Sequence, residues 1–302
     1  MQFTAKEEEY GKYGKALRLS NGKISLVAST DIGPRIISFS LEDGPNVLND
    51  DACPKVQHNF GEWKLYGGHR LWHSPEMNPR TYMPDNEPIA YEIQKESVLL
   101  TPKIEPYTQI QKQIQITPGK GKSVKILHKL INKSAWPLEM AAWAITVVAQ
   151  TGTLIIPMPS TDTGLLPNRL LTLWPYSKAC DARWVMTENF MILKHDPTIK
   201  APFKTGINNE AGWLACLSGG YLFVKKFTYD PNADYPDYGA STEVYTTDWG
   251  MEAGTLSPLQ VIPPDGEISH EEEWFIEKAE GLSPANPEMV AEEVNKMKPA
   301  KD

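Results

Sequence analysis

The chain has 302 residues, of which 41% are hydrophobic and 23% charged, and its formal net charge is −8. This length and composition are typical of a folded protein with one sizeable core, and they exclude a disordered chain. The negative charge and the lack of a basic run argue against nucleic acid or an anionic membrane surface as partners, because both need clustered lysine and arginine.

Alternation of apolar and polar residues predicts mostly β-strands, taken here in chain order. Residues 16–29 are predicted to form a hairpin through Asn21-Gly22, because both turn residues tolerate positive φ. Residues 35–41 continue the sheet, and a second hairpin joins 108–116, with Ile110, Ile114 and Ile116 on one side, to 123–131. Further strands are predicted at 141–149, 212–218, 220–227, 241–253 and 267–277. Helical spacing occurs only near the end, and it predicts a short helix over 286–297.

Many antiparallel strands at short intervals predict an all-β fold, a large twisted sandwich with few short helices. We expect one domain over residues 15–280, preceded by an extension at 1–14 and followed by a tail at 281–302 that holds the short helix. The proline-rich stretch 155–210 is predicted to form long loops or short edge strands over the sheet, where functional residues often lie. The oligomeric state is left open.

The prediction of compartment, and of no metal or cofactor, rests on what the sequence lacks. The N-terminal segment MQFTAKEEEYGKYGKAL has no apolar core of a secretion signal, and no apolar run approaches about 18 residues. The three cysteines (Cys53, Cys180 and Cys216) match no zinc spacing, and no P-loop or dinucleotide fingerprint occurs. We therefore predict a cytoplasmic protein without metal or cofactor, with a trimmed secreted form as the alternative.

Three segments resemble the aldose 1-epimerases and their relatives in the galactose mutarotase-like superfamily. They are IGPRIISFSLEDGPNVL (32–48), HKLINKSAWPLEMAAWAIT (128–146) and VYTTDWGMEAGTLSPLQVIPPDGEISHEEEWFI (244–276). Their order and spacing cover residues 15–278, and the nearest branch is one of unassigned function. The resemblance implies a twisted supersandwich of antiparallel sheets with a carbohydrate cleft on its concave face.

Active relatives open a sugar ring with a glutamate base and a histidine acid, and the resemblance carries these roles over only in part. The glutamate corresponds to Glu252 in WGMEAGTLSP, which becomes the predicted base; an ordinary solvent-facing carboxylate is the alternative. The histidine is expected near position 143, where this chain has Trp143. An indole cannot replace an imidazole in proton transfer, although it can stack on a sugar ring or pack in the core.

The segment GGHRLWHSPE (67–76) is the other candidate region for the site. By analogy with a glycine-rich loop in sugar-phosphate relatives, His69 is predicted as the acid and Arg70 as a clamp for hydroxyl or carboxylate groups. Trp72 is predicted to stack on the sugar, and His73 to bind it. A metal site formed by His69 and His73, with Glu76 as third ligand, is an alternative, although the H-E-x-x-H signature is missing. Glu76 is otherwise a substrate-binding candidate.

Three further charged residues are candidates for sugar binding. Arg35 lies in a strand among isoleucines and must either reach a cleft or pair with a carboxylate, because an unpaired buried charge is costly. Asp85 and Lys226 are weaker candidates, because their surroundings are also ordinary for turns and strands. His128 shares a strand face with Val124, Ile126 and Leu130 and is predicted to be a core residue.

We therefore predict a carbohydrate-active protein, most simply a mutarotase that uses Glu252 as base and His69 as acid on a small-molecule sugar. The alternatives are a carbohydrate-binding protein without turnover, which Trp143 favours, and another sugar-modifying enzyme such as a lyase. A shared scaffold does not choose among them.

Overall fold

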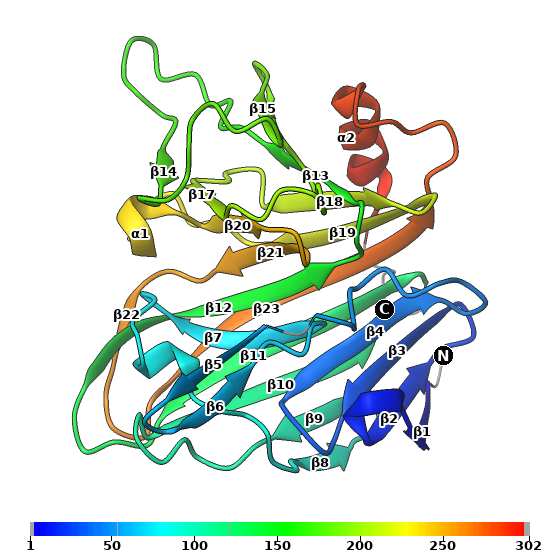
Figure 1. Cartoon of the computed structure of the whole chain (residues 1–302), viewed down its shortest axis with the longest axis vertical. Coiled ribbons are helices and arrows are strands. Elements are labelled where there is room, and N and C mark those ends of the chain that lie inside the picture. Colours follow the sequence, from blue (N-terminus) through cyan, green and yellow to red (C-terminus); the bar gives the residue numbers. More distant parts are fainter. Residues whose placement is uncertain (1–2, 53, 120, 299–302) are drawn as a thin grey trace.

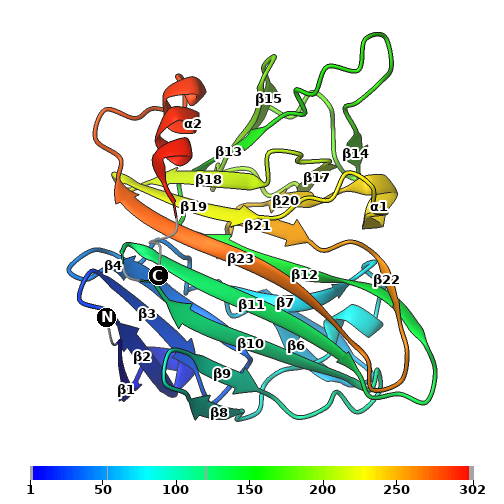
Figure 2. The same cartoon turned by 180° about the vertical axis from the view of Figure 1, so that it is seen from behind.

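A computed structural model describes residues 3–52, 54–119 and 121–298 and consists of two stacked antiparallel sheets (Figure 1). Cys53 lies outside the described residues. The two longest strands, β12 (Leu138–Val148) and β23 (Glu267–Lys278), cross the middle of the molecule, one in each sheet (Figures 1 and 2). The predicted all-β sandwich with few short helices is confirmed.

The first sheet carries the candidate site and has strands from both halves of the chain. In spatial order its strands are β1 (Thr4–Glu9), β2 (Lys15–Ser20), β3 (Ile24–Ser29), β4 (Arg35–Leu41), β7 (His69–Ser74), β12, β21 (Met251–Leu256), β20 (Thr242–Thr246), β17 (Phe203–Ile207) and β14 (Leu171–Leu173), and β22 (Gln260–Ile262) also pairs with β12.

The second sheet covers the inner face of the first. Its strands are β15 (Trp184–Met186), β16 (Phe190–Lys194), β13 (Thr153–Pro157), β18 (Trp213–Ser218), β19 (Tyr221–Phe227), β23, β11 (Ser123–Asn132), β10 (Ile110–Pro118), β9 (Val98–Thr101) and β8 (Ala90–Ile93). A separate hairpin pairs β5 (Lys55–His58) with β6 (Gly61–Lys64), and the helices are α1 (Pro236–Gly239), α2 (Pro287–Lys296) and the 3-10 turns Gly11–Tyr13 and Arg80–Tyr82.

The core lies between the two sheets because alternate residues of each strand face inward. On β10, Ile110, Ile114 and Ile116 are all buried on one face, as their alternation predicts. On β7, Leu71 joins this core, whereas its neighbour Trp72 belongs to an aromatic cluster on the opposite face. The central strands of the first sheet are therefore covered on both faces, so burial alone does not reveal which face carries a site.

Residues near both ends of the described chain belong to the fold. Residues 4–9, which fall in the predicted N-terminal extension, form an edge strand. This strand pairs with β2 along its whole length. Their mixed polar pattern, with mostly exposed side chains, explains why they do not read as a buried strand. Near the other end, Val290 and Val294 of α2 pack against the outer face of the second sheet (Figure 2). In the described residues, helices are too short or too polar to cross a membrane.

The Gly67-Gly68 pair is explained by the backbone that leads into β7. Both glycines have positive φ (96° and 67°), and a Cβ on Gly68 would lie 2.3 Å from the carbonyl oxygen of Ile36. Only glycine fits this close approach. The pair therefore determines the path of the backbone into β7 and, with it, which side chains of β7 face the core.

Candidate functional site: an aromatic cleft with paired charges

A cleft of about 360 Å³ lies on the outer face of the first sheet, opposite the core. Its floor is formed by alternate residues of β7, β12, β17, β20 and β21, and the β5–β6 hairpin supplies Val56 and Trp63 as a wall. Arg70 and Trp72 of β7 line it, whereas His69, Leu71 and His73 point from the opposite face of the same strand.

Antiparallel pairing places two charged residues of the cleft, Glu252 and Lys204, in one row across the sheet. Glu252 of β21 is paired with Tyr245 of β20, and Tyr245 is paired with Lys204 of β17. Because neighbouring strands are about 4.8 Å apart, the backbones that carry Glu252 and Lys204 are separated by about 10 Å. This distance leaves room for one sugar ring between the two side chains.

Aromatic side chains form most of the walls. They include four tryptophans and three tyrosines, Trp63, Trp72, Trp143, Trp249, Tyr82, Tyr176 and Tyr245. Trp72 contacts both Trp63 and Trp143, with ring centroids 5.3 and 5.6 Å apart. Flat aromatic faces beside hydrogen-bonding groups match the apolar faces and hydroxyl rims of a pyranose. Burial raises the pKa of the hydroxyls of Tyr82, Tyr176 and Tyr245, so these groups remain proton donors at neutral pH.

Arg70 and Glu252 form an ion pair at one end of the cleft. The Arg70 guanidinium donates a hydrogen bond to the Glu252 carboxylate at 2.9 Å and lies over the Trp72 ring, 4.4 Å from its centroid. Glu252 is 12% exposed and lines the cleft, so the predicted base does face the predicted clamp. The pairing with Arg70 fixes the direction in which the carboxylate points.

Lys204 forms a second charged centre at the other end. Its ammonium is 3.0 Å from Glu76 and 2.9 Å from Glu243, and it lies over the rings of Trp143 and Trp174. Burial lowers the pKa of Lys204, but the two carboxylates outweigh this and hold it above the ordinary value. Lys204 is therefore charged in a largely dry site.

The two carboxylates beside Lys204 differ in their environment. Burial raises the pKa of the Glu76 carboxyl, but Lys204, a hydrogen bond from Tyr82 and the Arg70 charge together bring it below its usual value. Glu243 is fully buried, and this burial raises its pKa to about 8 against the opposing effect of Lys204. The site thus places two carboxyl groups of different pKa beside one ammonium group, one lowered and one raised by its surroundings.

The predicted pairing of His69 with Glu252 in one groove is wrong. His69 is fully buried between the sheets, with Nδ1 2.9 Å from the Thr146 hydroxyl and Nε2 2.7 Å from Nε2 of His128. Burial, followed by the charges of His128 and Lys225, lowers its pKa well below the ordinary value. The reason is strand parity: adjacent residues on β7 face opposite sides, so Arg70 and His69 cannot both line the cleft.

The predicted metal alternative is not assembled either. His69 and His73 share a face of β7 but lie in separate surroundings, and Glu76 lines the cleft on the other side. The ligand atoms of His69, His128 and Glu272 do lie within 4.8 Å of one another. However, Glu272 is already paired with the Lys225 side chain, whose Nζ lies 2.7 Å from its carboxylate. His128 is a buried residue, as its strand face predicts.

Arg35 and Asp85 pair with each other and do not line the cleft. The Arg35 guanidinium lies 2.7 Å from the Asp85 carboxylate and donates to the carbonyls of Leu65 and Lys64. It therefore ties β4 to the segment that leads into β7. Of the two options that the sequence left open for Arg35, pairing with a carboxylate is the one realised.

Lys226 lies far from the cleft, at the end of α2. Its ammonium donates to the carbonyl oxygens of Val294 and Met297, so it caps the helix that covers the second sheet. Its predicted role in substrate binding is therefore wrong, because β19 belongs to the other sheet.

Replacing Lys226 by methionine is expected to leave sugar binding and turnover unchanged and to lower the free energy of unfolding by about 1 kcal/mol, the usual size of a lost cap. Urea unfolding and calorimetric titration with sugar measure the two quantities. A loss of sugar affinity at unchanged stability contradicts this assignment.

Comparison with solved structures identifies the architecture. A protein from Klebsiella pneumoniae provisionally assigned as an aldose 1-epimerase matches with a TM-score of 0.58 at 12% identity, over 99% of this chain and 89% of that one. A galactose mutarotase-like protein from Lactobacillus casei matches with a TM-score of 0.54 at 7% identity, over 87% of this chain and 100% of that one. The chain has the galactose mutarotase-like fold.

A TPR-domain containing protein from Parabacteroides distasonis shares this galactose mutarotase-like fold, with a TM-score of 0.57 at 13% identity. That match covers 89% of this chain and only 48% of the other, so the chain spans about half the length of that relative. No protein-family model and no curated protein sequence matches the chain.

Several residues of the cleft were not predicted from the sequence. The most important is Lys204, which is 4% exposed and lies between two carboxylates. A lysine in the short, uncharged surroundings of the strand FKTGI was the available signal, because a buried ammonium requires a partner. Its partner Glu243 similarly interrupts the strand TEVYT. Neither signal tells which strands are neighbours.

Proposed function

We propose that the cleft binds a monosaccharide and catalyses the interconversion of its anomers, with Glu252 as the base and Lys204 as the acid. The observation that carries this proposal is their placement in one row of the cleft floor, separated by Tyr245 and enclosed by aromatic walls. Lys204 takes the role that the sequence analysis gave to His69. Glu76, Arg70, Trp72 and Trp143 remain proposed substrate-binding residues.

The proposed reaction moves two protons and consumes nothing. Glu252 accepts the proton of the anomeric hydroxyl while the Lys204 ammonium donates one to the ring oxygen. The bond between the anomeric carbon and the ring oxygen breaks, and an open-chain aldehyde forms. Rotation about the adjacent carbon–carbon bond and reversal of both transfers close the ring to the other anomer and return each proton to its donor.

Neighbouring residues support the two proton transfers. Arg70 orients the Glu252 carboxylate, and Trp72 and Trp143 offer faces for the sugar ring. Glu243, with its raised pKa and its position 2.9 Å from the Lys204 ammonium, is a proton source beside the acid. The predicted cytoplasmic location stays a prediction.

The test compares equilibration of freshly dissolved anomers with and without the protein, by exchange NMR or polarimetry. Neutral aldohexoses, hexuronates and hexose phosphates are used separately, because the charge of the substrate is not fixed by a cleft that contains both signs. A faster rate with protein for at least one class supports the proposal. Equal rates for every class contradict it.

A carbohydrate-binding protein without turnover is the second candidate, and one observation favours it. No histidine lines the cleft among the described residues, and the proposed base is engaged in an ion pair with Arg70. Calorimetric binding of a sugar by a protein that does not accelerate its mutarotation distinguishes this function from the first.

A further inference from the structure

A second hollow, here called the end pocket, opens where the two sheets part at the end of β7. Its volume is about 350 Å³. Ile110, Leu138, Met140 and Met83 form apolar walls, and Phe60 and Tyr107 lie at the side. The end pocket shares no residue with the aromatic cleft, so the proposed sugar chemistry does not explain it.

His73 is a buried polar residue that lines the end pocket. It is 1% exposed, and neither ring nitrogen makes a hydrogen bond of good geometry within the described residues. Burial, followed by the charges of Lys112 and Arg80, holds its pKa well below the ordinary value, and only the Arg80 backbone acts in the opposite direction. His73 is therefore a neutral imidazole with one donor and one acceptor available at the pocket wall. Buried polar groups left in this way are uncommon and call for a ligand or water.

Arg80 supplies a positive charge to the same pocket. Its Nη2 donates to the carbonyl oxygen of Pro75 at 2.9 Å, but Nε is buried without a partner, and no ion pair of Arg80 with a carboxylate occurs in the described part of the chain. The nearby Lys112 is already paired with Glu105 at 2.5 Å. Glu139 is the carboxylate that lines the end pocket, and it lies exposed at the rim.

We propose that the end pocket binds a small monocarboxylate with an apolar body, its carboxylate held by Arg80 and His73. One guanidinium and one neutral imidazole match a single planar anion, because the guanidinium presents parallel donors to both carboxylate oxygens. A phosphate dianion would need more positive charge than these two residues provide. The walls of isoleucine, leucine and methionine match an alkyl or phenyl group, and they exclude a sugar, whose hydroxyls would lose their hydrogen bonds there.

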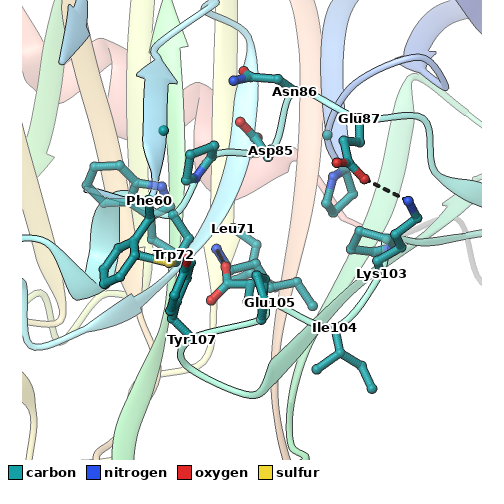
Figure 3. Close-up of a pocket in the computed structure, with 18 of the residues that line it drawn as sticks. Phe60, Leu71, Trp72, Asp85, Asn86, Glu87, Lys103, Ile104, Glu105 and Tyr107 are labelled. Carbon is teal, nitrogen blue, oxygen red and sulfur yellow. Dashed lines mark hydrogen bonds and ion pairs between the residues drawn. The ribbon is translucent and has the colours of Figure 1, made fainter. Parts of the chain in front are cut away.

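An adjoining hollow of about 560 Å³ meets the end pocket, and its lining includes the carboxylates of Asp85, Glu87 and Glu105. The two hollows share Phe60, Met83 and Tyr107, and the Phe60 and Tyr107 rings stand beside each other with centroids 3.8 Å apart (Figure 3). Trp72 and Leu71 close the inner side of the larger hollow, and the Glu87–Lys103 ion pair marks its outer rim (Figure 3).

The test uses octanoate and 3-phenylpropionate, each compared with its primary amide, in calorimetric titrations of the whole chain. The amides keep the shape and lose the charge. We expect both acids to bind with a dissociation constant below about 1 mM, and the amides to bind at least about tenfold more weakly. Arg80→Gln should weaken acid binding by a similar factor, and Arg80→Lys, which keeps the charge, by less. His73 ring signals in NMR should shift with the acids.

Two controls separate this proposal from folding defects and from the sugar cleft. The thermal midpoint of each variant shows whether it folds, and Glu252→Gln, which alters only the aromatic cleft, should bind the acids as the unaltered protein does. Equal binding of acid and amide, no binding of either acid at about 1 mM, or an unaltered affinity in a folded Arg80→Gln variant would overturn the proposal. The experiment measures carboxylate binding in the end pocket. Its outcome therefore does not depend on whether the aromatic cleft catalyses mutarotation.

Discussion

Replacing Glu252 by glutamine is expected to lower the protein-catalysed rate of anomer interconversion by about 100-fold or more, the usual contribution of a general base. Glutamine keeps the size of the side chain and can still accept a hydrogen bond from Arg70, but it cannot take a proton. Sugar affinity should change much less than the rate. Exchange NMR measures the rate, and calorimetry measures the affinity.

Lys204→Arg tests, in the same assay, whether Lys204 is the residue that donates a proton to the ring oxygen. Arginine preserves the positive charge between Glu76 and Glu243 and does not give up its proton at neutral pH, so binding is expected to persist while the rate falls. Glu271→Gln, an exposed change on β23, is the matched control and should leave the rate unaltered. A fully active Glu252→Gln or Lys204→Arg variant would remove that residue from the mechanism.

Mild acid is expected to destabilise the protein strongly, because several histidines are buried in a neutral form. Burial is the first cause that lowers the pKa of His69, His73 and His128, and it lowers that of His270 to about 3. In the unfolded chain these residues titrate near 6.5, so below this pH the unfolded state binds more protons than the folded state. Stability is therefore fully present above about pH 6.5 and is lost as the pH falls toward the folded pKa values.

The expected size of this effect is large. Each histidine that stays neutral only in the folded state contributes about 1.4 kcal/mol of destabilisation per pH unit below about 6.5. Urea unfolding at pH 7.5, 6.5 and 5.5 measures the slope. His270→Gln should reduce the slope, because glutamine cannot be charged and can keep the hydrogen bond to Thr255, and Glu271→Gln is the neighbouring control. A stability that does not change between pH 6.5 and 5.5 contradicts the neutral-histidine interpretation.

The alternating strands predicted from local pattern match the structure at both hairpins and at β12, β18, β19 and β23, because alternation reflects one buried face. The predicted run 241–253 is divided between the two strands β20 and β21. The short edge strands β14 and β15 fall inside the stretch 155–210, which was predicted to form long loops or short edge strands. The edge strand at residues 4–9 was missed because its side chains are mostly exposed.

The cleft could be predicted only in part. Sequence placed Glu252, Arg70, Trp72, Glu76 and Trp143 among the candidates, and all five line one cleft. It also selected His69, His73, Arg35, Asp85 and Lys226, which do not line the cleft. The structure places His69 in the core, His73 at the end pocket, Arg35 and Asp85 in an ion pair, and Lys226 at a helix end. The two sides of β7 are both buried, so hydrophobic pattern does not distinguish the residues that face the second sheet from those that face the cleft.

The sequence by itself determined most of the strands and the antiparallel class, because these depend on neighbours in the chain. Only the tertiary structure decided that Lys204 lies between Glu76 and Glu243, 128 positions from the first of them. Contacts of this kind depend on the order of strands in a sheet. Strand order is set by the packing of the whole core, and no local pattern of residues encodes it.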